Sequence, residues 1–549
     1  MIKTIQDYLP LSARQKVYLI LVFVSLGLLF FSAWQVRPVI VAVEAPLGLA
    51  SYLPTLYWVG LTLLVITSIF AFLDRDLKKD GIFIIILVAL GLFLQGITVF
   101  VYENAVDPTA YAPNAWVYNL LKTGHLDIAD PFGLASYYTW PAMHFISASL
   151  LEATGLDLIP IMKYAPIFWI LCFVFITYGI GKRFKLEPNR CFLISFLAIS
   201  SWLISYAGFY YARFPATILF LLLFMLLLVP RTTVGESVTA ILMFAALLLT
   251  HGLTAMAIIP GLILVSIYRR NYRFVALFFV MFVAWYIYQT TAFEAGIQAF
   301  TIPLRNIFEA VRMGGYQGAA SIARFVTRYS ELSYFALFVA LMIGSIILLL
   351  RQRIAGERRV QVIALFCWAV GVAFLVFWGH GEVVLRTYLY SIGPAACIVA
   401  LSFYSRKLLI PVMCFVVALS PLVNYGSQAD WGQVLTTELK GTKFFALEVK
   451  PQESYFYGYG EQLVVYNDTN LVTVPLHGFP VVAVSPDEVD LSVLDKSHYI
   501  LISKLTTERE MFLWKEAPYD AWPQTEVGRM ADLIYNNSYF QIYVNHSGK

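Results

Sequence analysis

The stretch Leu249-Thr250-His251-Gly252-Leu253-Thr254 decides the fold. It lies in the middle of an apolar region, residues 237–268, that is too long for a single helix crossing a hydrocarbon core of ~30 Å. We therefore predict two short helices that meet at His251. The number of times the chain crosses the membrane depends on this break, and so does the side on which every later loop lies.

The composition is that of a membrane protein. Of 549 residues, 60% are hydrophobic and 13% are charged, and the mean hydropathy is +0.72, whereas soluble domains carry about a quarter charged residues. The formal net charge of +4 is small, and no basic patch suggests a nucleic-acid partner. The five cysteines all fall in or at the ends of apolar stretches, so no disulfide framework is indicated.

Other apolar stretches are each long enough to cross a bilayer. They lie at residues 17–36, 55–73, 82–101, 164–181, 191–208, 214–230, 274–291, 333–350, 360–378, 387–404 and 408–425. With the two helices that meet at His251 they make about thirteen spans. We expect a polytopic α-helical domain over residues 1–425 that is embedded in the cell membrane.

Basic residues predict the orientation of this domain. If successive spans alternate in direction and the chain breaks at His251, about 20 Lys and Arg fall on one side of the membrane and about 9 on the other. Because the cytoplasmic side carries the excess, the N terminus is expected in the cytoplasm and residues 102–162 outside. The first apolar stretch lacks a small-residue cleavage site, so it is expected to remain as a span.

Hydrophobicity falls after Tyr425, and residues 426–549 are predicted to form a small extracytoplasmic α/β domain. Alternating apolar and polar residues predict its strands, and helical periodicity predicts its helices. The expected elements are strands at residues 462–466, at residues 498–503 and ending near Tyr543, and helices at residues 507–515 and 525–535. Three sequons, at Asn467, Asn536 and Asn545, are consistent with an external location.

A second external segment, residues 292–332, mixes charged and apolar residues and holds Gly314, Gly315 and Gly318 at its middle. This pattern is typical of an amphipathic helix that lies in the membrane interface rather than crossing the bilayer. We expect the glycines to act as a hinge within it.

The external loop of residues 102–162 is the chain's clearest candidate for chemistry, because loops of this length between packed elements are uncommon. It opens with Tyr102-Glu103-Asn104-Ala105-Val106-Asp107-Pro108. A carboxylate beside low-dielectric protein can act as a general base with a pKa tuned by burial, so Asp107 and Glu103 are the candidate catalytic acids. In the alternative interpretation, Asp107 caps a helix that begins at Pro108, and the two roles are compatible.

The rest of this loop is expected to face a sugar or an acceptor. We predict an amphipathic helix at residues 113–123 and a second helical stretch from His144 to Leu151. Aromatic side chains stack on sugar rings, although at this depth they also form an interfacial belt. The candidate sugar-binding or acceptor-binding residues are His125, Tyr137, Tyr138, Trp140 and His144.

Metal binding in the loop would have to use His125, Asp127 and Asp130. Their spacing matches no specific motif for zinc or calcium. The sequence therefore indicates neither a divalent metal nor any other cofactor.

Basic side chains at the predicted external end are candidates for binding a lipid phosphate. Ionisable groups at membrane depth are usually functional, and arginine suits phosphate because it makes bidentate contacts. The candidates are Arg213, His251, His380 and Arg386, the last in a short external turn. In the alternative interpretations, Arg386 forms a salt bridge with Glu382, Arg213 is an interface anchor and His251 caps a helix end.

These stretches together resemble the GT-C superfamily of membrane glycosyltransferases, which use polyprenyl-phosphate sugars. The resemblance covers residues 15–425. Within the superfamily, the chain looks like the prokaryotic, particularly archaeal, members. It is carried by Glu103 and Asp107, by Tyr137-Tyr138-Thr139-Trp140-Pro141-Ala142-Met143-His144, by residues 249–254 and by the turn from Glu382 to Arg386. It implies that Asp107 is the base and that Arg386 or Arg213 meets the lipid phosphate. The Trp-Trp-Asp signature of oligosaccharyltransferases is absent, which disfavours transfer of a whole glycan to asparagine.

The sequence thus predicts transfer of a sugar from a polyprenyl-phosphate donor to an acceptor hydroxyl on the extracytoplasmic face. The acceptor would be a glycan, a lipid or a protein, and the enzyme would sit among membrane lipid. Two alternatives remain open: a transporter or flippase of lipid-linked glycans, and a non-catalytic membrane assembly subunit. The chain contains no evident inverted repeat of the kind that secondary transporters use.

Overall fold

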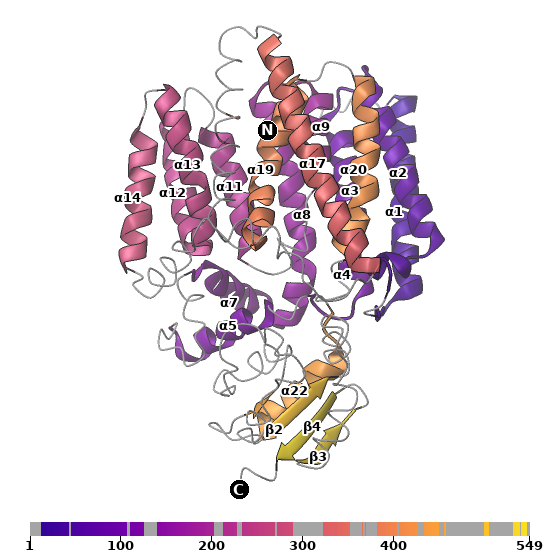
Figure 1. The fold of residues 1–549 in the computed structure, drawn as a ribbon, viewed down its shortest axis with the longest axis vertical. Helices are drawn as coiled ribbons and strands as arrows, with labels where there is room; N and C mark the ends of the chain where they lie inside the picture. Colours follow the sequence, from indigo (N-terminus) through magenta and orange to yellow (C-terminus); the bar gives the residue numbers. More distant parts are fainter. Residues whose placement is uncertain are drawn as a thin grey trace, which may run out of the picture.

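The structure is a computed structural model in which long helices form a bundle, with two short helices and a small α/β domain at one end of it (Figure 1). It describes residues 12–42, 45–106, 110–125, 140–201, 212–227, 233–269, 272–288, 322–351, 365, 368, 381–402, 406–426, 433–448, 455–456, 499–503, 531–537 and 540–545.

The bundle is built from helices that follow the apolar stretches of the sequence. They are α1 (Ala13–Val36), α2 (Thr55–Leu73), α3 (Asp80–Gly91), α4 (Ile97–Val101), α8 (Leu158–Arg183), α9 (Pro188–Ser200), α11 (Arg213–Leu227), α12 (Val234–Thr250), α13 (Gly252–Arg269), α14 (Arg273–Tyr288), α17 (Ile322–Arg351), α19 (Gly381–Ser402) and α20 (Arg406–Gly426). A π-helical turn, Leu92–Gly96, joins α3 to α4 without a break. The predicted helix positions agree with these bounds to within a few residues at most ends.

The described residues confirm a helical membrane protein. Five helices are long and apolar enough to cross a bilayer, and shorter apolar helices accompany them. The five are α1, α2, α3 with its continuation to Val101, α8 and residues 408–425 of α20. The expected total of about thirteen spans stays a prediction.

The predicted break at His251 is confirmed. Helix α12 ends at Thr250 and α13 begins at Gly252. Between them His251 has an extended backbone, with φ −164° and ψ 104°, and its N–H donates to the Leu247 carbonyl at 2.9 Å. Because α12 and α13 then pack against each other, the chain turns back at this residue.

Two expected boundaries in the membrane region are wrong. Residues 322–332 belong to the 30-residue helix α17 and not to a separate interfacial helix. Residues 381–386 form the first turns of α19 and not an external turn. In both places charged residues lie within the first turns of a long helix. Their charge suggests the end of a span, although the helix continues through them. Residues 292–321 lie outside the described ranges.

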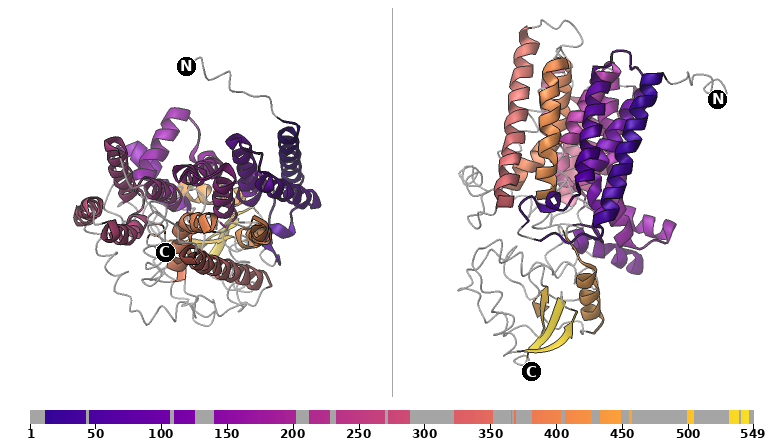
Figure 2. Two further views of the ribbon diagram at one scale, coloured as in Figure 1. Left: turned by 90° about the horizontal axis from the view of Figure 1, so that it is seen from above. Right: turned by 90° about the vertical axis from the view of Figure 1, so that its right-hand side faces the viewer.

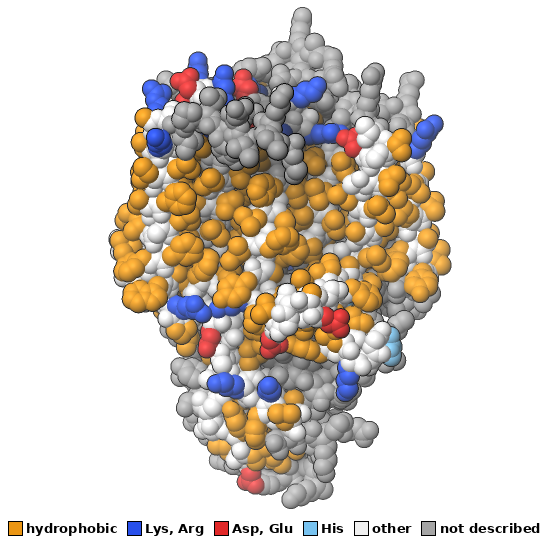
Figure 3. Space-filling view, turned by 180° about the vertical axis from the view of Figure 1, so that it is seen from behind, with side chains coloured by type: hydrophobic (Ala, Val, Ile, Leu, Met, Phe, Trp, Pro, Cys, Tyr) orange, Lys and Arg blue, Asp and Glu red, His pale blue; other side chains and the backbone are white. Residues whose placement is uncertain are grey.

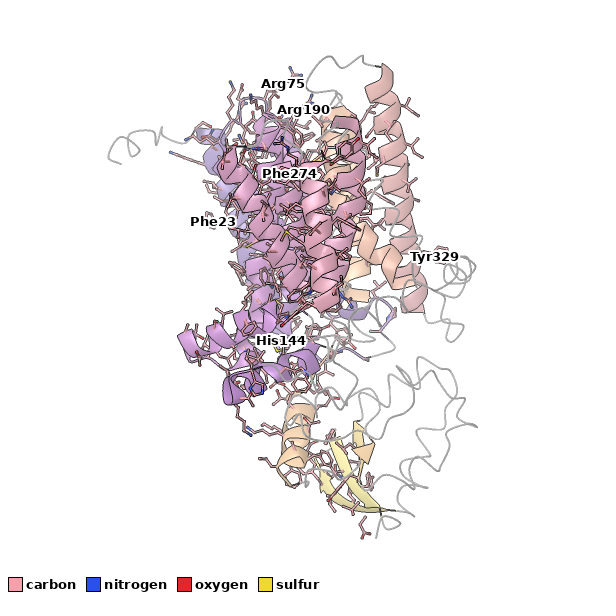
Figure 4. The ribbon with its side chains drawn as sticks, turned by 90° about the vertical axis from the view of Figure 1, so that its left-hand side faces the viewer. Phe23, Arg75, His144, Arg190, Phe274 and Tyr329 are labelled. Carbon is pink, nitrogen blue, oxygen red and sulfur yellow. The ribbon has the colours of Figure 1, made fainter. Side chains whose placement is uncertain are left out.

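On the face shown in Figure 3, an apolar band lies between two ends of the molecule that carry charged side chains. Arg75 and Arg190 lie at one end, and His144 lies at the other (Figure 4). Two ion pairs join helices at the first of these ends: Lys182 with Asp80 at 2.6 Å, and Arg183 with Glu236. The basic residues that the sequence predicts on one side of the membrane thus include several that share one end of the bundle.

The small domain follows α20 and lies at the same end as the short helices α5 (Tyr111–Thr123) and α7 (Ala142–Thr154) (Figures 1 and 2). Its described part is helix α22 (Thr436–Glu448) and a sheet in the order β1-β2-β4-β3. The strands are β1 (Tyr455–Phe456), β2 (Tyr499–Ser503), β3 (Ala531–Asn536) and β4 (Phe540–Asn545). β1 runs parallel to β2, and the other neighbouring pairs are antiparallel.

The strand expected at residues 498–503 and the final strand through Tyr543 are confirmed. The helix expected at residues 525–535 is wrong over its described part, because residues 531–535 belong to β3 and pair with β4. Ile534 and Tyr535 are of residue types that are enriched in strands, and β4 supplies the partner strand. Helix α22 was not predicted, and the strand expected at residues 462–466 and the helix at residues 507–515 lie outside the described residues.

Close contact between α8 and α9 depends on a glycine. A Cβ built on Gly181 would lie 2.8 Å from the Cys191 Sγ and 2.9 Å from the Cys191 Cα, whereas one on Gly179 would meet only the Met225 Sδ, at 3.8 Å. Small residues let membrane helices approach each other in this way. A methyl group at Gly181 must therefore displace backbone, and one at Gly179 need not.

We predict that Gly181→Ala destabilises the bundle by about 1–3 kcal/mol, the usual cost of overpacking. Gly179→Ala, on the same helix, is the matched control and should stay close to wild type. Thermal unfolding of both purified variants in one detergent measures the difference. Equal unfolding temperatures for the two variants would contradict the close contact between α8 and α9.

Candidate functional site

The described part of the loop of residues 102–162 includes the two short helices α5 and α7 at one end of the bundle. Helix α5 ends at Gly124, which adopts the left-handed conformation with φ 76° that glycine tolerates at a helix end. The predicted helices at residues 113–123 and from His144 to Leu151 are both confirmed. Helix α7 packs against α5 and against α12, so the loop lies against the end of the bundle where α12 stops at His251.

An apolar cluster fastens the loop in place, and we name it the loop cluster. It draws residues from the loop, from α8 and from the linker to the C-terminal domain. Its buried members are Ala105, Ala110, Tyr111, Val117, Leu120, Met143, Ala148, Leu158, Met162 and Val434. Ala212, directly before α11, packs against it. The loop, helix α8, the residue before α11 and the start of the C-terminal domain thus share one core.

The three residues that follow Tyr102 are each held by a hydrogen bond from a different element. The Glu103 carbonyl accepts from Lys163 Nζ of α8 at 2.9 Å, and the Ala105 carbonyl accepts from the Tyr111 hydroxyl of α5 at 3.0 Å. Between them, Asn104 Nδ2 donates to the Val434 carbonyl at 3.1 Å. The described chain then continues to the buried Val106, directly before Asp107 in the sequence.

Lys163 was not among the predicted site residues. It lies about 7.5 Å along the α8 axis from Leu158, with 7% of its surface exposed, and its ammonium points to the Glu103 carbonyl. With Asn104 and Val106 it lines a small cavity of about 10 Å³, near the volume that one water molecule needs. An ionisable group at membrane depth is itself a signal for function. The signal was missed because the predicted span began at residue 164.

His251 connects the loop to a distant helix. Its Nδ1 lies 2.9 Å from Thr254 Oγ1, which is hydrogen-bonded in turn to the hydroxyl of Tyr390 on α19. Across its ring lies Trp140 of the loop, with ring centroids 5.3 Å apart. His251 and Tyr390 are both buried. This chain of contacts, Trp140–His251–Thr254–Tyr390, is named the His251 relay.

The two predicted phosphate-binding arginines lie on helices whose first residues are at this end of the bundle. Arg213 is the first residue of α11 and is half-buried, and its carbonyl accepts from Thr217 Oγ1 at 2.8 Å. Arg386 lies on α19 one turn before Tyr390, the last residue of the His251 relay, although its side chain lies outside the description. The sequence did not identify Tyr390 as a site residue.

The two described histidines of the loop have different surroundings. His144 lies on the buried face of α7, with 4% of its surface exposed. His125 is exposed, and its ring Nδ1 lies 3.1 Å from the carbonyl of Thr123 in its own turn. His144 is therefore part of the loop's interior, whereas His125 lies at its outer edge.

Several predicted site residues lie outside the described residues: Asp107, Tyr137, Tyr138 and His380, together with Asp127 and Asp130. Glu103 is described, and its side chain is exposed. Within the described ranges, no group of three or more His, Cys, Asp and Glu is arranged to hold a metal ion. The catalytic, phosphate-binding and sugar-binding roles of the named residues stay predictions.

The arrangement supplies three chemical features at one end of the bundle. It has a buried ammonium beside the loop backbone, a histidine in contact with an aromatic ring, and an arginine at the start of a helix. Cationic and hydrogen-bonding groups at a low-dielectric boundary suit binding of an anion. Aromatic faces such as that of Trp140 suit an apolar or sugar-ring contact.

The His251 relay should contribute to stability. Thr254→Val keeps the shape of the side chain but removes the hydroxyl on which His251 Nδ1 and the Tyr390 hydroxyl both converge, and breaking such a buried contact costs about 1–3 kcal/mol. Thr254→Ser retains the hydroxyl and should restore most of the loss. Thermal unfolding of the wild type and the two variants measures the effect. A valine variant as stable as the serine variant would show that the relay contributes nothing to the free energy of unfolding.

The chain matches no protein-family model and no curated protein. Solved structures similar to it include the oligosaccharyltransferase of Archaeoglobus fulgidus in complex with zinc and sulfate, with a TM-score of 0.49 and 11% identity over 84% of this chain and 73% of that one. ArnT from Cupriavidus metallidurans bound to undecaprenyl phosphate has a TM-score of 0.48 and 14% identity, covering 85% of this chain and 97% of that one. The apo state of the same ArnT gives a TM-score of 0.40.

These proteins are GT-C glycosyltransferases, the superfamily that the sequence resembles. Identities of 11–14% and TM-scores below 0.5 identify neither a substrate nor the residues that act on it. The proposals that follow therefore rest on the residues of this chain.

Proposed function

We propose that this chain is a membrane glycosyltransferase that moves a sugar from a polyprenyl-phosphate donor to an acceptor hydroxyl on the extracytoplasmic face. The observation that supports this most directly is the His251 relay. It joins Trp140 of the first external loop to Tyr390 on α19, the helix that also carries Arg386. A candidate sugar-side residue and a candidate phosphate-side helix are thereby connected at one end of a membrane bundle.

In this proposal the donor lies across the membrane boundary. Its polyprenyl tail runs between the spans, and its phosphate meets Arg386 and Arg213, with His251 and His380 nearby. Its sugar faces the loop, where Trp140, Tyr137, Tyr138 and His125 line the sugar and acceptor side, and His144 supports this wall from the loop's interior. Arginine is suited to the phosphate because its guanidinium stays charged and binds two oxygens at once.

The transfer step needs one base and one good leaving group. The Asp107 carboxylate takes the proton of the acceptor hydroxyl as the acceptor oxygen attacks the anomeric carbon of the sugar. The bond from that carbon to the phosphate oxygen breaks, and the polyprenyl phosphate leaves with the electron pair. Positioning of the two substrates and cations on the leaving phosphate lower the barrier.

The proposed topology puts the N terminus in the cytoplasm and the loop and C-terminal domain outside. It is supported by the gathering of Arg75, Arg190 and the ion pair of Lys182 with Asp80 at the end of the bundle opposite His144. The loop and the C-terminal domain lie together at that other end.

The base assignment predicts that Asp107→Asn lowers kcat by about 10²–10⁴-fold, because the amide cannot accept the proton. The measurement is release of polyprenyl phosphate from radiolabelled polyprenyl-phosphate hexoses by the purified protein in lipid vesicles. Glu103→Gln is the matched variant at the other candidate acid. Loss of turnover in Glu103→Gln with normal turnover in Asp107→Asn would move the base to Glu103.

The same assay separates the proposal from its rivals. A flippase would carry the labelled lipid across the vesicle bilayer without releasing polyprenyl phosphate, and a non-catalytic subunit would do neither. Either result with the wild-type protein would refute the proposed activity.

The phosphate assignment predicts a defect in donor binding. Arg386→Gln removes a charge-assisted contact worth about 1.5–3 kcal/mol, which corresponds to a rise in the donor Kd of about 10–100-fold. Titration of the vesicle-embedded protein with a polyprenyl-phosphate hexose measures the donor Kd, and Arg213→Gln is compared in parallel. An unchanged Kd in both variants would exclude these arginines from the phosphate site.

A further inference from the structure

We propose that Asn104 is a positioning residue that couples the C-terminal domain to the segment leading into Asp107. The catalytic part of this proposal rests on the proposed function. The C-terminal domain would then act on the transfer step, through the base-bearing segment, and would not merely be attached to the membrane bundle. The argument starts from the two contacts of the Asn104 side chain.

The Asn104 amide links two parts of the chain that lie far apart in sequence. Its Nδ2 donates to the Val434 carbonyl at 3.1 Å and to Thr436 Oγ1 at 3.0 Å. A side-chain amide nitrogen carries two hydrogens, so both donors are used. Val434 lies two residues before α22, and Thr436 is the first residue of that helix. One short side chain thus holds the start of the C-terminal domain against the loop.

The neighbours of Asn104 in this segment are hydrogen-bonded by α8 and α5, and Ala105 also packs with Val434 in the loop cluster. Lys163 of α8 holds the Glu103 carbonyl, and Tyr111 of α5 holds the Ala105 carbonyl. Asn104 adds to this apolar packing two directional hydrogen bonds, through which movement of the C-terminal domain would reach the segment. Asp107 follows three residues later in the sequence, a chain length of at most about 11 Å.

The start of α22 is itself well defined. The Leu435 N–H donates to the Glu438 carboxylate at 3.0 Å, which satisfies a backbone donor that the helix start would leave unpaired. Glu438 is 2% exposed, and Val434 and Leu435 are both buried. The two acceptors of Asn104 therefore lie at or next to a well-defined helix start. If α22 moves, these acceptors move with it, and the Asn104 side chain follows them.

From α22 the coupling continues into the sheet. A Cβ on Gly441 would lie 2.1 Å from a ring carbon of Phe540 on β4, so the helix and the strand are in direct contact. Asn537, between β3 and β4, donates to the Thr437 carbonyl at 3.0 Å. The sheet, α22 and Asn104 form one continuous set of contacts. A displacement of the sheet would therefore also displace Asn104 in the loop.

The chain offers a matched control in the same linker. The Gln433 side chain accepts from the Val41 N–H at 3.0 Å and donates to the Val41 carbonyl at 2.7 Å. This contact anchors the same linker, but to the loop that follows α1 and not to residues 103–106. Gln433→Ala therefore weakens the anchorage of the linker while leaving the Asn104 contacts in place.

The test compares five full-length variants with the wild type. Asn104→Ala and Asn104→Asp remove both donors, the second while keeping the size of the side chain. Thr436→Val removes one acceptor, and Thr436→Ser retains it. Gln433→Ala is the control.

Hydrogen–deuterium exchange of peptides covering residues 102–111 is measured for each variant in lipid vesicles. Sugar transfer is measured alongside as kcat and as the KM for the polyprenyl-phosphate donor. The exchange measurement requires no catalytic activity.

Both Asn104 variants should exchange at least about 10-fold faster over residues 102–111, which corresponds to the loss of roughly one hydrogen bond's free energy. They should lower kcat by at least 10-fold while the donor KM stays within about twofold of wild type. The exchange rate and kcat of Thr436→Val should lie between those of the Asn104 variants and those of the wild type. Both quantities should match wild type in Thr436→Ser and in Gln433→Ala.

Unchanged exchange in Asn104→Ala would overturn the coupling. Equal kcat losses in Gln433→Ala and Asn104→Ala would also overturn it, since anchorage of the linker in general would then be the cause. Faster exchange with normal kcat in the Asn104 variants would refute the positioning role. If the wild type transfers no sugar, the proposed function fails, and the exchange data alone decide whether Asn104 couples the domain to the loop.

Discussion

The architecture depends on how one helix break inside the bundle is stabilised. A backbone that leaves the helical conformation in a membrane must still satisfy its polar groups. At His251 the N–H donates to Leu247, the carbonyl accepts from the N–H groups of Thr254 and Ala255, and the ring contacts Thr254 Oγ1. Because of this break, α13 turns back along α12.

The same break also brings the loop and the bundle together. Trp140 covers the His251 ring, and Thr254 extends the contact to Tyr390 on α19. A polar group buried in a bundle needs such partners, since leaving it unsatisfied costs free energy. The need to satisfy one buried histidine thereby joins three segments that are separated by more than a hundred residues in sequence.

Hydropathy identified the helices, since burial in lipid demands long apolar stretches whatever the neighbours are. Boundaries were harder to predict where charged residues lie within a helix. Residues 322–332 and 381–386 are helical although they contain charged residues, and Lys163 lies inside α8 with its ammonium donating to the Glu103 carbonyl. Residues 531–535 form a strand because β4 pairs with them, which no local pattern could indicate.

The sequence by itself determined the class of the protein, the positions of most helices, the break at His251 and the acids and aromatics worth testing. These follow from local hydropathy and residue chemistry, which every short stretch carries on its own. Only the tertiary structure decided that Asn104 meets Val434 and that Lys163 meets Glu103. Such contacts join residues far apart in the chain, and their partners become known only when packing brings the segments together.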